Sequence, residues 1–316
     1  MQRREFLTTS VAAMSAVAAG QMVFGTADSP QPIIDTHQHL WDLSKFRLPW
    51  LGAASSSPIS RSFLPKDYEA ATAGLNVVKT VYMEVDVAPE QQAAEADYVI
   101  DLCQRDDNPM AAAVISGQPG TPEFEPYVRK YAKSPYIKGL RRVLPKSTTT
   151  PGICLQDNFV RSIKLLGDLG LRYDLCLPAA DLADAAKLVA QCPETSFILD
   201  HCGNMPVVSQ DQELRQLWET SLKEMAAKPN VVCKISGIVA SANEDWKPAD
   251  LAPIVNFVIE TFGEDRVMFA SDWPVCTRRA SFAQWVEGLK KIVKDRTPSF
   301  RQKLFHDNAM RVYALA

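Results

Sequence analysis

The chain has 316 residues, of which 47% are hydrophobic, and carries a formal net charge of −3 at pH 7. Neither this charge nor any basic run favours binding to nucleic acid or to an acidic membrane surface, so we expect a small-molecule ligand. The length is sufficient for one α/β barrel of about 250 residues and does not by itself require two domains.

The first residues have the features of an export signal. Arg3 and Arg4 precede a modest apolar run over residues 11–20, and small residues at 25–27 are suited to cleavage. This pattern predicts a twin-arginine signal peptide over residues 1–27, the twin-arginine export machinery as its partner, and a periplasmic or otherwise exported mature protein. The apolar run is shorter than the roughly 20 residues of a membrane span, so we expect no permanent membrane anchor. A disordered tail is the alternative.

Two apolar residues precede the segment Asp35–His39, which reads Asp-Thr-His-Gln-His. This is the pattern of a short buried strand, and its two-residue period turns Asp35, His37 and His39 to one face. The chain has only four histidines. Placing two of them at the end of one strand predicts a site, and a hydrogen-bonded structural pair is the alternative.

A long connection over residues 40–64 follows this strand and carries Trp41 and Trp50. Loops of this length in compact domains are usually functional or disordered, and the two tryptophans favour function. We therefore expect Trp41 and Trp50 to contact a substrate.

Beyond this connection, strand and helix patterns alternate. Strands are predicted over residues 77–85, 111–116, 137–144, 172–177, 196–201, 231–236 and 266–271, and helices over 65–73, 89–105, 122–133, 158–169, 180–191, 210–227, 248–262, 281–294 and 299–313. Such alternation requires a parallel sheet covered by helices, and eight strands counted from Ile33 predict a single (β/α)8 TIM-barrel domain over residues 28–316. An open doubly wound sheet is the competitor, but it would normally have a glycine-rich turn at residues 37–39.

Ionisable residues follow nearly every predicted strand, at the end where barrel enzymes place catalytic groups. His37, His39, His201 and Asp272 could hold one divalent ion, with zinc the first choice, and leave a position open for water. Asp272 would then accept the proton of that water. The same residues also work without a metal, if imidazoles donate hydrogen bonds to a carbonyl oxygen while Asp272 deprotonates bulk water. Spacing does not choose between these two forms of catalysis.

Arg141 and Lys234 are the cations expected to hold a substrate carboxylate or a polarised oxygen. Arg142 should face away from Arg141 in a regular strand. Glu84 and Asp174 complete the expected substrate-binding set, although ion pairs within the barrel are the structural alternative for these charges. A nucleophilic Cys202 or Cys276 is a weaker hypothesis, because neither thiol has a dedicated partner.

Several motifs together resemble the lactonase branch of the amidohydrolase superfamily, which includes L-fuconolactonase, L-rhamnonolactonase and 2-pyrone-4,6-dicarboxylate lactonase. They are Asp35-Thr36-His37-Gln38-His39, Trp41-Asp42, Pro49-Trp50-Leu51, Gly139-Leu140-Arg141, Tyr173-Asp174-Leu175, Leu199-Asp200-His201, Cys233-Lys234-Ile235-Ser236-Gly237 and Ser271-Asp272-Trp273-Pro274-Val275. The resemblance extends from about residue 33 to residue 313. It implies hydrolysis of a sugar-acid or carboxylated lactone to a hydroxy acid, with or without one divalent metal ion.

In this resemblance Asp272 is the general base, and the three histidines polarise the carbonyl or hold the metal. The superfamily's binuclear members use a carboxylated lysine on the fourth strand and a histidine on the fifth, where this chain has Arg141 and Asp174, so a two-metal site is not expected. Arg142 replaces a frequent histidine and weakens the case for a sugar-like substrate. The alternatives are a zinc-dependent non-oxidative decarboxylase of the same superfamily and a non-catalytic exported ligand-binding barrel.

Overall fold

The computed structural model describes residues 30–52, 57–144 and 150–316. The segment predicted to be a signal peptide, residues 1–27, lies outside the described residues. Residues Gln31–Ala316 form one compact unit. Within the described residues, no helix combines the length and the hydropathy needed to cross a membrane.

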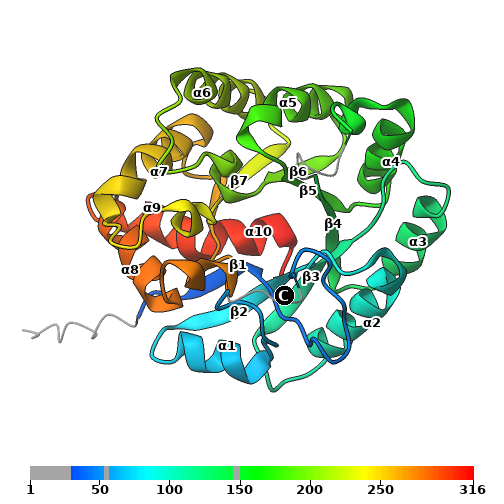
Figure 1. Ribbon diagram of the computed structural model, residues 1–316, viewed down its shortest axis with the longest axis horizontal. Coiled ribbons are helices and arrows are strands. Elements are labelled where there is room, and N and C mark those ends of the chain that lie inside the picture. The colour runs from blue at the N-terminus through cyan, green and yellow to red at the C-terminus, as the bar shows by residue number, and fades with distance from the viewer. Residues whose placement is uncertain (1–29, 53–56, 145–149) are drawn as a thin grey trace, which may run out of the picture. The chain divides into compact units, whose positions relative to one another are not determined.

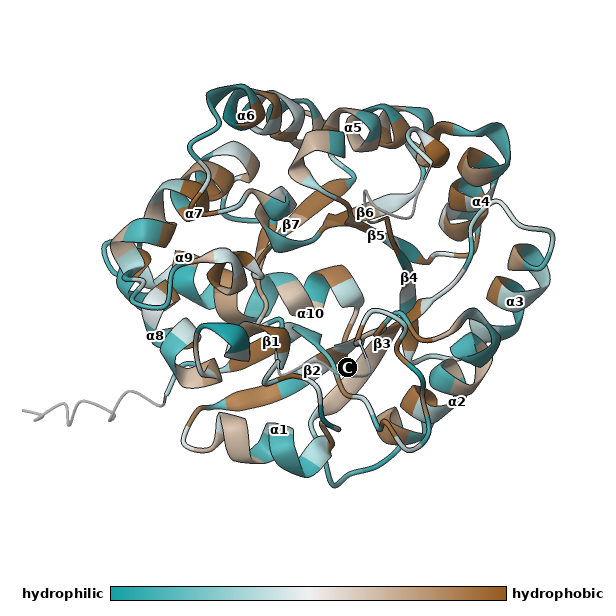
Figure 2. Cartoon of the chain, viewed as in Figure 1, coloured by the Kyte–Doolittle hydropathy of each residue, from teal (hydrophilic) through white to brown (hydrophobic). Residues whose placement is uncertain are grey.

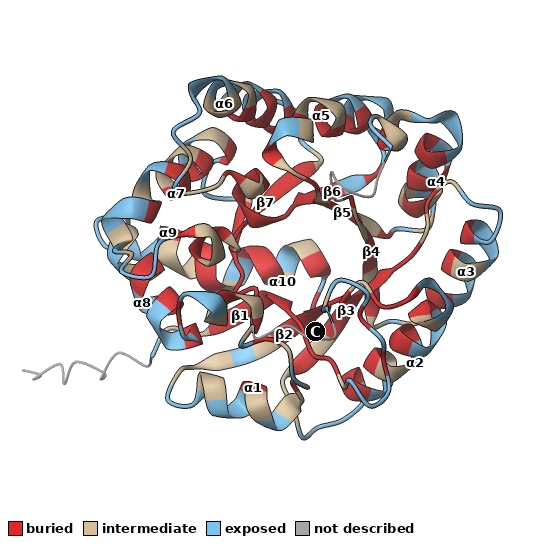
Figure 3. Ribbon diagram, in the orientation of Figure 1, coloured by how far each residue is buried: buried red, intermediate tan, exposed pale blue. Residues whose placement is uncertain are grey.

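Eight strands form one sheet in sequential order, and every neighbouring pair is parallel. Their bounds are β1 Ile33–Gln38, β2 Val77–Met83, β3 Met110–Ser116, β4 Ile137–Val143, β5 Arg172–Cys176, β6 Ser196–Leu199, β7 Val231–Ile235 and β8 Val267–Phe269. Figure 1 shows these strands as an inner ring, and Figure 3 shows that the ring is mostly buried. The predicted (β/α)8 barrel is confirmed.

The ring closes where the chain beyond β8 meets β1. The backbone N–H of Asp272 donates to the His37 carbonyl over 2.9 Å, and that of His39 donates to the Trp273 carbonyl over 2.8 Å. A parallel bridge joins Gln38 to Trp273, and the Thr36 hydroxyl donates to the Phe269 carbonyl over 2.7 Å. The same hydrogen bonds that close the barrel therefore bring Asp272 next to the two histidines of β1.

Apart from α10, the α-helices lie outside the strands and turn apolar faces toward them (Figure 2). Their bounds are α1 Pro65–Thr72, α2 Gln92–Cys103, α3 Phe124–Tyr131, α4 Asp157–Asp168, α5 Leu182–Gln191, α6 Gln212–Ala226, α7 Pro248–Phe262, α8 Phe282–Ile292, α9 Pro298–Gln302 and α10 Asn308–Tyr313. The predicted helix over residues 299–313 is interrupted, because a π-helical turn, Lys303–Asp307, separates α9 from α10. The buried Asn308 side chain fixes the start of α10 by donating to the carbonyls of Glu264 and Val267, each over 2.8 Å.

Helix α10 covers the amino-terminal end of the barrel. Ala309 and Tyr313 pack against interior side chains of β1, β2, β3 and β8. Lys138, near the start of β4, donates to the Ala314 carbonyl, and Arg172, at the start of β5, donates to that of Val312. Since α10 fills this end, a ligand can approach the barrel interior only from the carboxyl ends of the strands.

Candidate active site

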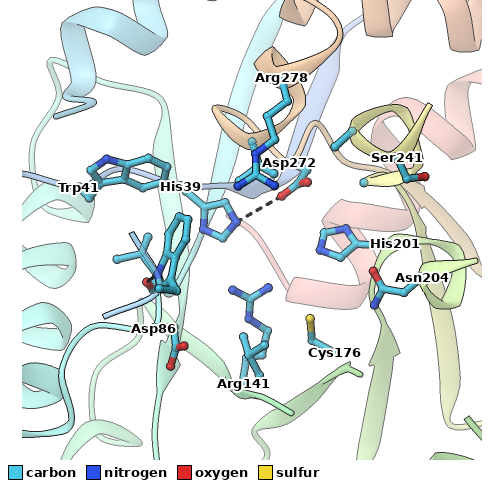
Figure 4. A pocket seen from close by; sticks show the side chains of 16 residues that line it. His39, Trp41, Asp86, Arg141, Cys176, His201, Asn204, Ser241, Asp272 and Arg278 are labelled. Carbon is cyan, nitrogen blue, oxygen red and sulfur yellow. Dashed lines mark hydrogen bonds and ion pairs between the residues drawn. The ribbon is translucent and has the colours of Figure 1, made fainter. Parts of the chain in front are cut away.

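A cavity of about 480 Å³ opens at the carboxyl ends of the strands (Figure 4). Its walls are mainly apolar, and a small number of polar and charged side chains converge on it, as in most ligand sites. The lining residues are His39, Trp41, Trp50, Val85, Asp86, Arg141, Val143, Cys176, His201, Asn204, Gly237, Ala240, Ser241, Asp272, Val275 and Arg278.

The two histidines of β1 point at each other through their Nε2 atoms, which are 3.1 Å apart. The Nδ1 of His39 lies 2.9 Å from the Met83 carbonyl oxygen, which can only accept a hydrogen bond, so this nitrogen carries the proton. Arg141 Nη1, which can only donate, lies 3.2 Å from His37 Nε2, so the proton of His37 is on Nδ1, where it faces Asp200 Oδ1 at 3.3 Å rather than Lys234 Nζ at 3.5 Å. Both Nε2 atoms therefore present lone pairs to one point, an arrangement suited to a cation or a hydrogen-bond donor.

His201 and Asp272 approach the same point from the chain beyond β6 and β8. Asp272 Oδ1 lies 3.4 Å from His39 Nε2 and 3.8 Å from His37 Nε2, while His201 Nδ1 lies 2.9 Å from the Ser236 hydroxyl. Both residues have left-handed backbones, with φ of 56° and 57°. Such conformations cost of order 1–3 kcal/mol each and persist only where the surroundings enforce them.

Gly237 makes room for the His201 ring. Its φ is +68°, and a Cβ built on it would lie 2.5 Å from both Cγ and Nδ1 of His201. Only glycine satisfies both the backbone conformation and the close approach.

The donor set fits a single divalent cation. His37, His201 and Asp272 each offer a ligand atom, and these atoms lie within 4.8 Å of one another. The sequence also predicted His39 as a ligand, but His39 is not part of this group, although its Nε2 lies 3.1 Å from His37 Nε2 and 3.4 Å from Asp272 Oδ1. Nitrogen and carboxylate donors in this combination are typical of zinc sites.

The Arg141 guanidinium lies beside His37. Its Nη1 is 3.2 Å from His37 Nε2 and 3.3 Å from Asp200 Oδ2. Glu84 holds the rest of the group, because its carboxylate accepts from Nε over 2.6 Å and its backbone carbonyl accepts from Nη2 over 2.8 Å. As expected, Arg141 is buried and Arg142 turns away, donating instead to the Pro119 carbonyl.

Lys234, Asp174 and Glu84 lie beneath the floor of the cavity and do not line it. Lys234 Nζ is 2.5 Å from Asp174 Oδ2 and 3.1 Å from Asp200 Oδ1, and all three side chains are 0% exposed. The sequence predicted Lys234, Asp174 and Glu84 as substrate contacts; the structure places them in ion pairs that support Arg141 and His37.

These buried charges set the protonation of the site. Burial lowers the pKa of His37 well below its usual range, although Asp200 opposes the shift, so the imidazole is neutral at pH 7. Burial also lowers the pKa of His201. Burial alone would raise the pKa of Asp200, but Lys234 and His37 outweigh it and hold that pKa well below the usual value. Asp200 is therefore an ionised partner that orients His37.

Trp41 and Trp50 form one wall of the cavity, and their contact with a substrate stays a prediction. Their rings meet edge to face with centroids 5.7 Å apart. The Trp50 indole N–H donates to the Val85 carbonyl over 2.7 Å, and that of Trp41 donates to the Arg61 carbonyl over 2.5 Å. The hydrogen bonds fix both rings, so this wall is preformed.

Sequence reasoning did not select Asp200, Ser236, Asp86 or Arg278 as site residues. Asp200 and Asp86 do stand just beyond the ends of their strands, the position that marked the selected residues. Ser236 follows β7 in the same way. Arg278 lies six residues after Asp272 in a short helical turn, and no local pattern distinguishes it.

The barrel and its histidine and aspartate cluster define a class of enzymes that activate water or a carbonyl group at the carboxyl ends of the strands. The amidohydrolase family profile matches residues 34–315, and the chain belongs to this family.

Among its relatives, the protein y4mH of Sinorhizobium fredii is 30% identical, over 89% of this chain and 98% of that protein. L-fucono-1,5-lactonase of Burkholderia multivorans is 28% identical, over 89% of this chain and 96% of the enzyme. A crystal structure of a Burkholderia multivorans amidohydrolase with bound zinc superposes with a TM-score of 0.79 at 25% identity, covering 90% of this chain and 99% of that one.

Proposed function

We propose that this protein is a lactonase, which hydrolyses a sugar-acid or carboxylated lactone to a hydroxy acid. The observation that carries the proposal is that His39, His201, Asp272 and Arg141 line one cavity, with His37 buried behind them and in contact with His39 and Arg141. One relative, L-fucono-1,5-lactonase of Burkholderia multivorans, aligns with this chain over 96% of its own length, and its name supports the same chemistry.

Asp272 is the general base in this proposal. Its carboxylate lines the cavity and takes a proton from a water molecule as the water oxygen attacks the lactone carbonyl carbon. The ring C–O bond then breaks, and Asp272 returns the proton to the departing ring oxygen. Asp272 ends the cycle ionised, and the product is a hydroxy acid with a new carboxylate.

The negative charge that develops on the carbonyl oxygen needs a preformed electrostatic partner. The Arg141 guanidinium lines the cavity and is held rigidly by Glu84, and the His201 imidazole lines the opposite side. A divalent ion, zinc being the first candidate, would be held by His37, His201 and Asp272, with His39 beside them, and would supply Lewis acidity toward the carbonyl. The proposal includes both metal-assisted and metal-independent hydrolysis.

This function is tested by measuring acid release from a panel of lactones with wild type, Asp272→Asn and the control variant Asp265→Asn. Loss of a general base typically lowers kcat by a factor of about 10² to 10⁴. Asp265 is an exposed aspartate paired with Lys303, so its variant should match wild type. An Asp272→Asn enzyme as active as wild type would remove Asp272 from the mechanism, and carbon dioxide release without ester cleavage would favour a decarboxylase.

Metal dependence is measured separately, from the metal content of the purified protein and from its activity before chelation, after chelation and after zinc is added back.

For the precursor, we propose export by the twin-arginine machinery on the strength of Arg3 and Arg4. Replacing both arginines with lysine should then keep the protein in the cytoplasm when localisation is followed by fractionation.

A further inference from the structure

One carboxylate of the cavity takes no part in the cluster described above. Asp86 follows β2 and lines the cavity on the same side as Trp41, across from His201 and Asn204 (Figure 4). Within the described part of the chain, no group donates a hydrogen bond to its carboxylate and no cation forms an ion pair with it. Asp86 is partly buried, and its carboxylate is free to accept hydrogen bonds from a ligand in the cavity.

The backbone presents Asp86 in a left-handed conformation, with φ of 49°. Two buried carboxylates shape this turn: Glu84 accepts from the Asp86 N–H over 2.7 Å, and Glu95 accepts from the Val85 N–H over 2.8 Å. Glu95 is itself fixed by the hydroxyls of Tyr82 and Ser116. Strained, over-determined residues of this kind cluster at functional sites.

The surroundings of Asp86 fit a hydroxylated ring. An ionised carboxylate accepts short, charge-assisted hydrogen bonds from hydroxyl groups. Trp41 and Trp50, on the same wall, offer apolar ring faces for the C–H groups of such a molecule. Asp272 lies within 4 Å of two imidazoles, whereas Asp86 makes no such contact and is not placed to activate water.

We propose that Asp86 is a specificity-determining residue that accepts hydrogen bonds from ring hydroxyls of the substrate, which selects hydroxylated lactones over unsubstituted ones. This inference rests on the lactonase function proposed above. It narrows the substrate class and adds a residue that contacts the substrate away from the scissile bond.

The experiment compares two kcat/KM values: that of the best hydroxylated lactone of a panel, and that of the unsubstituted lactone of equal ring size, γ-butyrolactone or δ-valerolactone. In Asp86→Asn the ratio of these values should fall by a factor of about 10 to 100, the range for a hydrogen bond to a charged group, mainly through KM of the hydroxylated lactone. Glu90→Gln, which removes an exposed carboxylate paired with Arg47, should leave the ratio within twofold. An unchanged ratio in Asp86→Asn would overturn the assignment.

Binding of the corresponding hydroxylated lactam, measured by calorimetry, separates this inference from the proposed function. Lactam binding that Asp86→Asn weakens, in a protein that hydrolyses no lactone, would retain Asp86 as a binding residue and reject the lactonase. Lactone hydrolysis with an unchanged ratio of kcat/KM values in Asp86→Asn would retain the lactonase and reject Asp86 as a specificity-determining residue. A wild type that neither hydrolyses lactones nor binds the lactam would overturn both.

A stability measurement excludes a merely structural role. Burial and Glu84 raise the pKa of Asp86 to about 6, while Arg141 and Arg142 oppose the shift. The ionised form therefore destabilises the fold above that pH, and this penalty disappears below the unfolded-state value of about 3.9. Asp86→Asn should raise Tm by about 2 °C at pH 8 and leave it unchanged at pH 4. A large fall in Tm at pH 8 would mean that Asp86 supports the fold, against the proposal.

Discussion

Lys234 is the most deeply buried cation of the site, and replacing it tests the charge arrangement under the cavity. Its ammonium is 0% exposed and contacts Asp174 and Asp200, which are also 0% exposed. Lys234→Met keeps most of the side-chain volume and removes the charge. Removing one partner of a buried ion pair typically destabilises a protein by 3–5 kcal/mol, because the other charge is left uncompensated.

From the structure we expect the loss of stability in Lys234→Met to lie at the lower end of that range. Asp200 retains Arg141 and His37 as neighbours, so its negative charge remains compensated. Burial, opposed by Lys234, raises the pKa of Asp174 to about 7, and loss of the lysine would let this carboxyl take up a proton and become neutral. We therefore expect a loss of about 3 kcal/mol at pH 7.

Urea unfolding followed by circular dichroism measures this loss. The double variant Lys234→Met/Asp174→Asn should recover part of the stability, because it also removes the carboxyl that must take up a proton to stay buried in the single variant. The deficit of the single variant should also shrink from pH 7 to pH 5, because Asp174, with a pKa of about 7, is then protonated in wild type as well and no longer forms an ion pair with Lys234. A loss below about 1 kcal/mol, or a double variant no better than the single one, would refute the ionised pair.

Two further substitutions probe the site and the far end of the barrel. Gly237→Ala should lower the free energy of unfolding by about 1–2 kcal/mol, because of the left-handed backbone, and should lower kcat/KM about 100-fold by displacing His201. The control Gly170→Ala, at a position with φ of +70° and open space around it, should lower only the urea midpoint. Equal activities of the two variants would contradict the close approach of Gly237 to His201. Asn308→Ala leaves the carbonyls of Glu264 and Val267 without their donor and should lower the free energy of unfolding by about 2 kcal/mol, with kcat/KM unchanged. A loss of activity in the folded variant would place α10 closer to the reacting groups than the structure does.

The sequence was sufficient to predict the barrel because the alternation of strands and helices is a local, periodic signal. The interruption before Asn308 was not predictable, since the bonds that fix it join α10 to carbonyls more than 40 residues away. Strand periodicity also assigned Arg141 to the interior and Arg142 to the outside, as observed.

The site was predicted less completely. The meeting of His37, His39, His201 and Asp272 followed from their places at strand ends. Sequence spacing shows which face of a strand a residue occupies but not its depth in the barrel, which depends on strand tilt and register. For this reason Glu84, Asp174 and Lys234 were predicted as substrate contacts, whereas they are buried and do not line the cavity.

The position of α10 has a consequence for the order of folding. Ala309, Tyr313 and Leu315 close the lower barrel against interior side chains of β1, β2, β3 and β8, most of which lie far from them in the chain. Contacts between residues so distant in sequence close large loops, which costs chain entropy before any contact is made. We therefore expect this end of the barrel to be sealed late in refolding, after the strands have paired.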